Sequence, residues 1–180
     1  MSILLTGDRV LLREFVPDDW RAVHAYDTLP EIYRFQPWGP NTPEETRAYV
    51  DTVIAASRAE PRDRYGLAIV LKATGVFIGA CELKIKDRRF RAGEIGYVLH
   101  SRHWGHGYAT EAARLLLAFG FGPQGLHRIQ ATCHPQNTAS SRVLQRLGMQ
   151  YEGRMRETML LRDGWRDSDL YSILDAEWAP

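Results

Sequence analysis

Two glycines separated by one residue constrain the fold of this chain more than any other feature. They lie in the stretch 102–112, RHWGHGYATEA, between a predicted strand at 93–99 and a predicted helix at about 108–119. Gly105 and Gly107 lack Cβ atoms and can take positive φ, so successive N–H groups can converge on one point. That point is a helix N-terminus, where free amides and the macrodipole attract anions. The stretch predicts a site for a phosphate or pyrophosphate.

Two common phosphate loops do not match this stretch. A dinucleotide-binding fingerprint has a third glycine three residues after the second, where this chain has Thr110. A Walker loop closes with Gly-Lys-Ser or Gly-Lys-Thr, whereas Gly107 is followed by Tyr108 and Ala109. A tight connection that binds nothing is the alternative interpretation of the glycines alone.

The stretch resembles the acyl-CoA loop of the GNAT N-acetyltransferase superfamily, whose signature is Gln/Arg-x-x-Gly-x-Gly/Ala. Arg102, Gly105 and Gly107 stand at its fixed positions. Together with the preceding GEIGYVL, the stretch is similar to the RimJ/RimL branch, the ribosomal-protein N-terminal acetyltransferases. That branch usually has Lys or Arg between the glycines. Because His106 stands there, the resemblance implies a pyrophosphate site made by backbone groups.

A second stretch carries the same resemblance. Residues 137–149, NTASSRVLQRLGM, match the RimJ/RimL pattern Asn-x-x-Ser-x-x-Val-Leu-x-Lys/Arg-Leu-Gly-Phe, with Met149 in place of the final Phe. The residues themselves predict a short helix that is capped by Asn137 or Thr138 and ends at Gly148. With two motifs in this order, the resemblance covers essentially the whole chain.

Hydrophobic periodicity predicts a mixture of strands and helices. In chain order the predicted elements are a strand at 10–13, helices that open at 17 and 42, strands at 65–71, 76–85 and 93–99, the helix at 108–119, a strand at 127–134, the helix from 138, and closing strands at 154–161 and 169–174. Helices separate only some consecutive strands, so the order predicts an α+β protein with a mixed sheet. The GNAT fold has this order, and the resemblance implies a central sheet splayed at the acyl-CoA site. We expect one GNAT domain over residues 1–180.

The composition limits the classes of function. A formal net charge of +1 gives no general attraction to nucleic acid or to an anionic membrane. The N-terminal sequence does not match a signal peptide, and no apolar run is long enough to span a membrane, so we expect a cytoplasmic protein. Cys81 and Cys133 have apolar neighbours in predicted strands and are expected to be buried free thiols. No metal cluster is evident in the sequence.

The resemblance implies acetyl-CoA as the acyl donor and assigns its contacts. The amides of the pantetheine arm would pair with backbone groups of Val98 and Leu99, where this strand splays from the strand at 128–134. Asn137 is matched to a family residue that hydrogen-bonds the coenzyme arm. The residues expected to hold the pyrophosphate are Arg102, Gly105, His106, Gly107, Tyr108, Ala109 and Thr110.

The resemblance also implies direct attack of an amine on the thioester, assisted by proton-handling groups. Superfamily members often carry a tyrosine acid seven residues after the asparagine, but Leu144 stands there. Ser140 is the RimL-like candidate to protonate or bind the thiolate. Glu94 is the candidate base, and Glu82 competes with it. The alternatives are a serine that only caps a helix and carboxylates that only form ion pairs.

The acceptor implied by the resemblance is a protein or peptide α-amine. A small amine, such as an aminoglycoside, a polyamine or an antimetabolite, is the alternative, since the aromatic segment 32–38 could line a substrate pocket or fill the core. A non-catalytic acyl-CoA-binding module would need neither Glu94 nor Ser140. Nucleic-acid binding through the arginines at 88–91 and 154–166 is a third class, against which the net charge weighs. A homodimer is considered as well.

Overall fold

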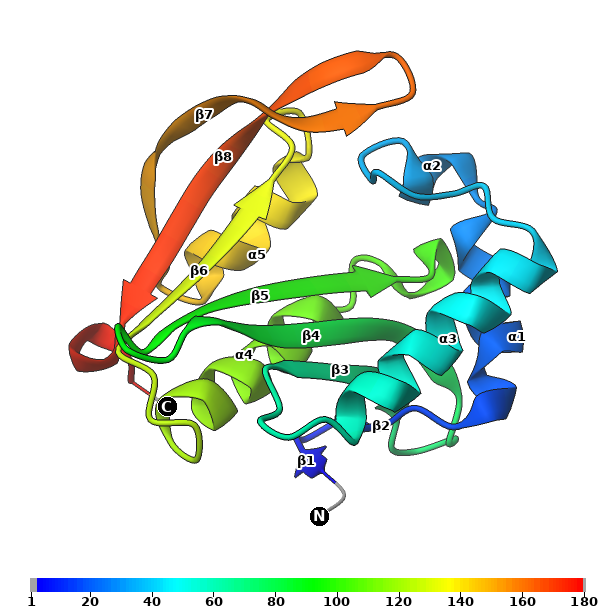
Figure 1. Cartoon of the computed structure of the whole chain (residues 1–180), viewed down its shortest axis with the longest axis horizontal. Coiled ribbons are helices and arrows are strands. Elements are labelled where there is room, and N and C mark those ends of the chain that lie inside the picture. The colour runs from blue at the N-terminus through cyan, green and yellow to red at the C-terminus, as the bar shows by residue number, and fades with distance from the viewer. Residues whose placement is uncertain (1–2, 180) are drawn as a thin grey trace.

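The computed structural model describes residues 3–179, and its eight strands form one mixed sheet in the order β1-β2-β3-β4-β5-β6-β8-β7 (Figure 1). The strands are β1 (Leu4–Thr6), β2 (Val10–Glu14), β3 (Arg64–Leu71), β4 (Phe77–Asp87), β5 (Ala92–Leu99), β6 (Arg128–Cys133), β7 (Gln150–Leu161) and β8 (Gly164–Leu174). The β5–β6 pair is parallel, and the other neighbours are antiparallel. The predicted mixed sheet is confirmed.

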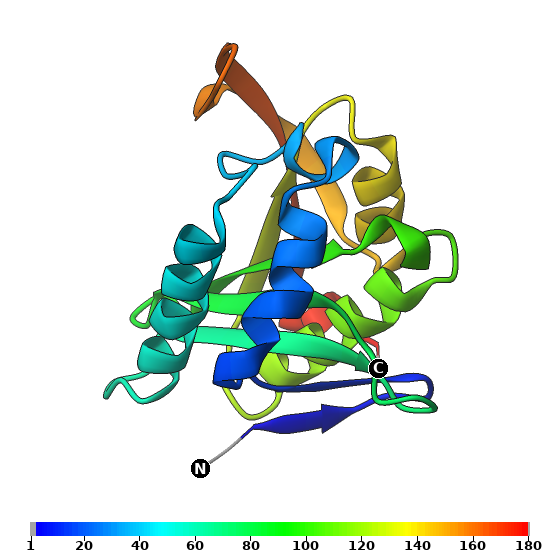
Figure 2. The same ribbon diagram turned by 90° about the vertical axis from the view of Figure 1, so that its right-hand side faces the viewer.

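Helices cover both faces of the sheet. They are α1 (Trp20–Asp27), α2 (Pro30–Tyr33), α3 (Pro43–Ser57), α4 (Tyr108–Phe121) and α5 (Thr138–Arg146), with short 3-10 turns η1 (Pro17–Asp19), η2 (Ser101–His103) and η3 (Asp175–Glu177). The perpendicular views place α1 and α3 on one face and α4 and α5 on the other (Figures 1 and 2). Within residues 3–179, no helix combines the length and apolar character that a membrane crossing requires.

The helix starts follow the capping chemistry of the sequence. Thr42 caps α3: its hydroxyl accepts the Glu45 N–H at 3.2 Å, while the Glu45 carboxylate accepts the Thr42 N–H at 2.7 Å. Asn137 caps α5 by accepting the Ser140 N–H at 3.1 Å. Both starts lie where the sequence predicts them.

The predicted closing strands are too short, and two elements were missed. The strand predicted at 154–161 begins at Gln150, and the strand predicted at 169–174 begins at Gly164. Their alternation is hidden because the ladder has irregular steps between Tyr151 and Gly153 and between Met155 and Met159. The missed elements, β1 and α2, have only three and four residues, too few for a periodic signal.

The largest core cluster lies between the sheet and helices α4 and α5. Leu83, Leu116, Leu117 and Ile129 are fully buried in it. Cys81 and Cys133 belong to the same cluster, and both are buried and free, as predicted. Burial raises the pKa of the Cys133 thiol to about 11, and it raises the pKa of Cys81 further. Neither thiol has the depressed pKa of a reactive cysteine.

The sheet opens between its two central strands. β5 and β6 pair only over Ala92–Glu94 and Arg128–Gln130, and beyond this point they diverge (Figure 1). The Arg91 carbonyl faces β6, accepting the His127 N–H, and the His100 N–H donates to Ile78 beside β4. Because backbone groups alternate in direction along a strand, those of Tyr97 and Leu99 face the opening and those of Val98 face β4. One edge of β5 is thus left without a partner strand.

Candidate functional site

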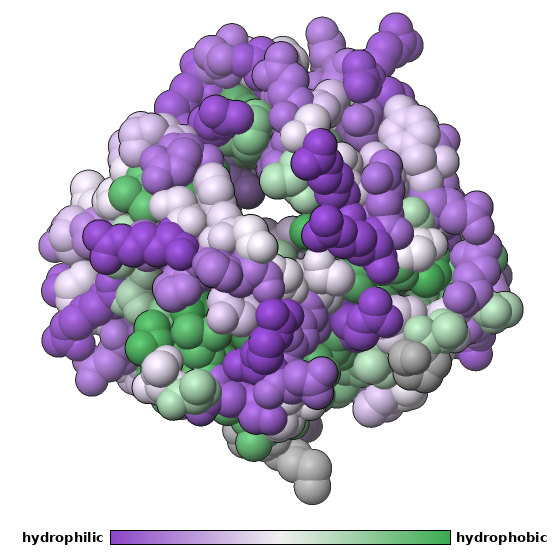
Figure 3. Space-filling view, turned by 180° about the vertical axis from the view of Figure 1, so that it is seen from behind, coloured by the Kyte–Doolittle hydropathy of each residue, from purple (hydrophilic) through white to green (hydrophobic). Residues whose placement is uncertain are grey.

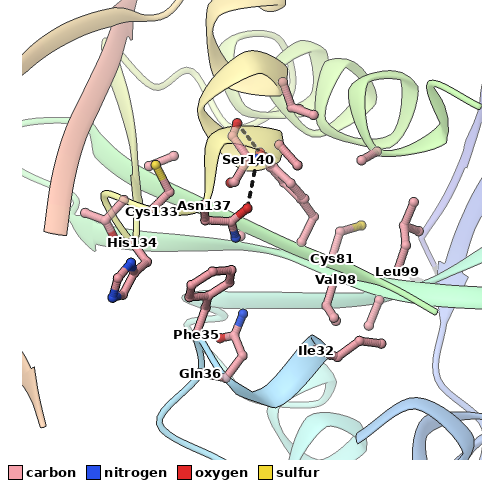
Figure 4. Close-up of a pocket in the computed structure, with 18 of the residues that line it drawn as sticks. Ile32, Phe35, Gln36, Cys81, Val98, Leu99, Cys133, His134, Asn137 and Ser140 are labelled. Carbon is pink, nitrogen blue, oxygen red and sulfur yellow. Dashed lines mark hydrogen bonds between the residues drawn. The ribbon is translucent and has the colours of Figure 1, made fainter. Parts of the chain in front are cut away.

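A cavity of about 1110 Å³ occupies the opening between β5 and β6. Figure 3, the view from behind, shows the molecule hollowed near its centre. The wall is made by residues of α1, α2, α3, α4 and α5 together with strands β3 to β8. In Figure 4, Asn137 and Ser140 lie on one side of the opening and Ile32, Phe35 and Gln36 lie on the other.

One end of the cavity is the N-terminus of α4. Gly105 and Gly107 have φ of 79° and 80°, the left-handed region in which a side chain is strained. Gly107 is the N-cap of α4, and no side chain of the described residues caps this helix. Gly105, Gly107, Tyr108, Ala109 and Thr110 all line the cavity. The first amides of α4 are therefore available to an anion.

The hydroxyl of Thr110 is an orphan. Its Oγ1 atom is buried, yet it has no hydrogen-bond partner among the described residues. An unsatisfied buried hydroxyl costs about 1–3 kcal/mol, and this one lies in the first turn of α4 on the cavity wall. A polar ligand at the helix terminus would satisfy it.

Arg9 supports this loop from outside the cavity. Its Nη1 donates to the His106 carbonyl at 2.9 Å, and its Nε donates to Glu111 Oε2 at 2.9 Å. Glu111 also accepts the N–H groups of Arg9 and Val10, at 2.7 and 3.0 Å. Burial by itself would raise the pKa of Glu111, but these hydrogen bonds outweigh it, and the pKa is lowered. Sequence reasoning missed Arg9, because it lies 97 residues from His106.

Two of the residues predicted to bind the pyrophosphate lie apart from the others. The cavity wall, within residues 3–179, includes neither Arg102 nor His106. Both residues are exposed, and the His106 ring lies 5.6 Å from the Tyr108 ring. Their roles stay predictions, and what the structure places near the cavity is the backbone of this loop.

The open edge of β5 forms the middle of the cavity. The Leu99 carbonyl accepts the Trp104 indole N–H at 3.0 Å, so its N–H remains the group directed into the opening. The side chain of Val98 lies on the wall, although its backbone faces β4. Of the two residues predicted to pair with a coenzyme arm, Leu99 has its backbone in the opening and Val98 does not. Tyr97, which sequence reasoning missed, does.

Ser140 is held at the start of α5 by two neighbours. Its N–H donates to Asn137 Oδ1 at 3.1 Å, which Figure 4 marks. Its Oγ lies 3.0 Å from the Tyr97 hydroxyl, which also lies 3.2 Å from the Ser140 carbonyl oxygen. Burial raises the pKa of Tyr97, so its phenol stays protonated. Leu144, one turn further along, is buried in the core.

The two candidate bases lie on the opposite face of the sheet, toward α1 and α3. Glu94 Oε2 accepts the Gln130 amide N–H at 3.0 Å and lies 3.6 Å from Lys86 Nζ. Glu82 has closer cationic partners, since its carboxylate contacts Arg64 at 2.9 Å and Lys84 at 2.8 Å. Both carboxylates line the cavity. Glu94 therefore has fewer and longer contacts with cations than Glu82.

The aromatic segment 32–38 closes the cavity on this side. Ile32, Phe35 and Trp38 all line the cavity, and Ile32 is also buried in the core with α1 and α3. The Phe35 ring lies 4.8 Å from the ring of His134 at the end of β6. Burial, together with Arg166 and Arg34, lowers the pKa of His134, so this ring is neutral at neutral pH. The segment both fills core and lines the cavity.

The arginines considered for nucleic-acid binding have acidic neighbours. Arg88 contacts Asp63 at 2.7 Å, and Arg154 contacts Asp169 at 2.9 Å. These pairs offset part of the positive charge of both segments. Among residues 3–179, no group of three or more His, Cys, Asp or Glu side chains is arranged to hold a metal ion.

Comparisons with known proteins agree with this geometry. Residues 9–150 match the model of the acetyltransferase (GNAT) domain. The chain is 33% identical to an uncharacterised N-acetyltransferase of Bacillus subtilis, YnaD, over 97% of this chain and 98% of that protein. It is 32% identical to the ribosomal protein uS5-alanine N-acetyltransferase of Escherichia coli, over 51% of this chain and 47% of that protein.

A solved structure shares the fold. RimJ of Mycobacterium smegmatis, in complex with CoA-disulfide, superimposes with a TM-score of 0.83 and 25% identity, covering 98% of this chain and 86% of that one. The resemblance predicted from the two motifs is confirmed. With most of its length matched by one family model, the chain belongs to the GNAT family and is an N-acetyltransferase, with ribosomal-protein alanine N-acetyltransferases among its relatives.

Proposed function

We propose that this protein transfers the acetyl group of acetyl-CoA directly to the α-amine at the N-terminus of a protein or peptide. One observation carries the proposal: a single cavity connects the α4 terminus, the open edge of β5 and the two carboxylates Glu82 and Glu94. Acetyl-CoA needs an anion site, a site for its amide-bearing arm and a place for the thioester. The α4 terminus, the open edge of β5 and the region beside the two carboxylates meet these three needs in the same order.

The α4 end of the cavity suits the pyrophosphate. The amides that follow Gly107 and the orphan hydroxyl of Thr110 are donors without protein acceptors among the described residues. Anions are stabilised at such a terminus by the hydrogen bonds and by the helix dipole. The RimJ structure in complex with CoA-disulfide supports coenzyme binding by this family.

The open edge of β5 suits the arm and the thioester. The N–H groups of Tyr97 and Leu99 face the opening and can donate to a ligand carbonyl. A donor placed at the thioester oxygen stabilises the charge that develops there during attack. We therefore assign this task to Leu99 or Tyr97, because the backbone of Val98 faces β4.

Glu94 is proposed to receive the proton from the attacking amine. It lies at the last paired step of β5 and β6, opposite Gln130, where the opening begins. Glu82 lies across the ladder from Gly96 on the same face, but Arg64 and Lys84 already engage its carboxylate. We propose that Glu82 instead neutralises the positive charge of these two residues at the end of the cavity where the acceptor amine would bind.

An α-amine is the acceptor that such a base serves best. At pH 7, deprotonating a lysine side chain costs about 4–5 kcal/mol, whereas a terminal α-amine costs about 1 kcal/mol. A carboxylate is a weak base compared with either amine. The relative that acetylates an alanine of ribosomal protein uS5 also supports a protein N-terminus as the acceptor.

A small amine is the second candidate. The contact between Phe35 and His134 joins the α2 segment to the end of β6 and narrows the acceptor side of the cavity. A narrow entry favours a compact acceptor over a folded N-terminus. The two candidates differ in what a blocked α-amine does to the reaction.

The test is release of CoA thiol from acetyl-CoA with three acceptor panels: peptides with free N-termini, the same peptides with blocked α-amines, and small amines such as aminoglycosides and polyamines. We expect release with the free peptides only. Release with small amines alone would overturn the peptide assignment and keep the reaction. Acetyl-CoA that raises the melting temperature without release in any panel would favour a non-catalytic binding module.

A further inference from the structure

The hydroxyl of Tyr97 has no role in the reaction described so far. This residue is on β5, and its side chain crosses the base of the opening to the first turn of α5. Its oxygen lies 3.0 Å from Ser140 Oγ and 3.2 Å from the Ser140 carbonyl oxygen. Both residues line the cavity, so the pair borders the space in which a coenzyme thiol would lie.

A tyrosine phenol carries one proton, which allows two arrangements of this pair. If Tyr97 donates to the Ser140 carbonyl, its oxygen is free to accept the serine proton, which then is not offered to a ligand. If Tyr97 donates to Ser140 Oγ, the serine proton is free to point into the cavity. The short distance to Oγ permits the second arrangement.

We propose that Tyr97 is a positioning residue that donates its O–H to Ser140 Oγ, so that the Ser140 O–H donates to the sulfur of the leaving CoA. This inference rests on the proposed function, because it names how the same cavity stabilises the departing thiolate. A hydrogen bond whose donor is itself polarised by a second hydrogen bond is stronger.

The step balances without proton transfer from either hydroxyl. The amine nitrogen bonds to the acetyl carbon, the carbon–sulfur bond breaks, and its electron pair stays on sulfur as a thiolate. The proton of the amine goes to Glu94. Burial raises the pKa of the Tyr97 phenol far above that of a thiol, so the phenol keeps its proton and acts only as a hydrogen-bond donor.

The surroundings hold the pair in place and add no competing charge change near neutral pH. Asn137 fixes the Ser140 backbone at 3.1 Å. Cys81, which lies opposite Tyr97 in the β4–β5 ladder, and Cys133 on β6 are the titratable groups that face the phenol. Burial raises the pKa of both thiols, so they stay neutral. Arg142 of α5 is also on the wall.

The direct test measures the pKa of the thiol of bound CoA, from thiolate ultraviolet absorbance across a pH titration. We expect the bound thiol to titrate below free CoA in the unchanged protein. In Tyr97→Phe we expect the acid dissociation constant of the bound thiol to fall about tenfold, which raises its pKa by roughly one unit. One hydrogen bond to a charged group has about this effect. Ser140→Ala should raise the pKa of the bound thiol by an equal or larger amount. Ser140→Thr, which keeps a hydroxyl, should leave that pKa as low as in the unchanged protein.

Tyr65→Phe is the matched control. Tyr65 is also a buried strand tyrosine, and its hydroxyl donates to Gln124 Oε1 at 2.7 Å away from the cavity wall. This variant should leave the thiol unchanged. Equal thiol pKa values in Tyr97→Phe and Tyr65→Phe would overturn the inference. So would a double variant Tyr97→Phe/Ser140→Ala in which the thiol pKa is clearly higher than in Ser140→Ala alone.

Kinetics separate this inference from the proposed function. Tyr97→Phe should lower kcat about tenfold with the acetyl-CoA KM within twofold. CoA that does not bind the unchanged protein would overturn both proposals. CoA that binds with an unshifted thiol would overturn only the role of Tyr97. A melting curve identifies any variant that fails to fold, and for such a case Ser140→Ala and Ser140→Thr carry the same comparison.

Discussion

The two ends of the cavity are built in opposite ways. The anion end comes from one contiguous stretch around Gly105 and Gly107, and it presents backbone amides. The acceptor end is assembled from side chains of β4, β5, β6 and the segment that follows α2, such as Phe35, Glu82 and Glu94. Backbone recognition depends little on which residues are present, provided that the glycines allow the turn. Side-chain recognition changes with every substitution, so we expect this end to determine which acceptor binds.

The largest expected effect comes from breaking the acceptor end. Glu94→Gln should lower kcat about 100-fold or more, because an amide cannot take the proton of the amine. Glu82→Gln should lower it much less, since Arg64 and Lys84 already engage that carboxylate. Initial rates with a peptide acceptor check both. The loss in Glu94→Gln should shrink above about pH 8, where the α-amine is already neutral. The reverse ranking would reassign the base.

The second effect comes from breaking the anion end. Gly107→Val places a β-branched residue at φ of 80° and should weaken CoA binding about tenfold to 100-fold by distorting the amides, with a strain of about 1–3 kcal/mol. Titration calorimetry measures the affinity. Gly75→Val is the control, because its φ of 69° imposes similar strain in a hairpin turn far from the cavity. Similar CoA affinities in the two variants would remove the loop from the site.

A smaller effect concerns the support of the anion end. Glu111→Gln should lower the free energy of unfolding at pH 7 by about 1–2 kcal/mol, because its charged hydrogen bonds with Arg9 are weakened. The lowered pKa of Glu111 stabilises the fold above the unfolded pKa near 4.5, and that contribution is lost as the pH falls through the folded pKa. Urea unfolding should thus show the difference at pH 7 and a progressively smaller one as the pH falls below the unfolded pKa.

The control for that measurement is Glu44→Gln. Glu44 is another acidic residue in a first helical turn, but it is exposed and lies 3.7 Å from Arg47. An exposed pair of this kind contributes about 0.5 kcal/mol or less. A difference between Glu111→Gln and the unchanged protein that persists at low pH would show that shape, and not charge, supports the loop.

The smallest effect sharpens the assignment of specificity. Phe35→Ala removes the contact with His134 and should change acceptor KM values about twofold to tenfold, with bulkier acceptors gaining relative to smaller ones. The affinity for CoA should stay unchanged. Phe90→Ala, on the exposed β4–β5 turn, is the control. A change in CoA affinity with unchanged acceptor preference would move this segment to the coenzyme side.

The sequence predicts the anion end better than the acceptor end for a physical reason. A glycine pair before a helix is a local signal, and so are the caps Thr42 and Asn137, because their partners lie within a few residues. In the sequence, Tyr97 is recognisable only as an aromatic residue of a predicted strand. Its contact with Ser140 depends on how β5 and α5 are placed in three dimensions. The direction of the Val98 backbone likewise follows from the ladder with β4.

The mixed sheet and the order of elements followed from periodicity, whereas β1, α2 and the true extent of β7 and β8 did not. The latter involve very short runs or strands with irregular ladder steps, where alternation is lost. Arg9 lay outside any motif. Its contacts with the loop became visible only in the folded chain.

The contact of Arg9 with the His106 carbonyl has a consequence for the order of folding. The stretch 102–112 is local in sequence, but its shape is supported by a residue 97 positions away. Closing so long a segment of chain costs conformational entropy that only wider folding can offset. We therefore expect an isolated fragment spanning the loop and α4 to lack the anion-binding shape. The loop that is the clearest motif in the sequence would therefore reach its final shape late in folding.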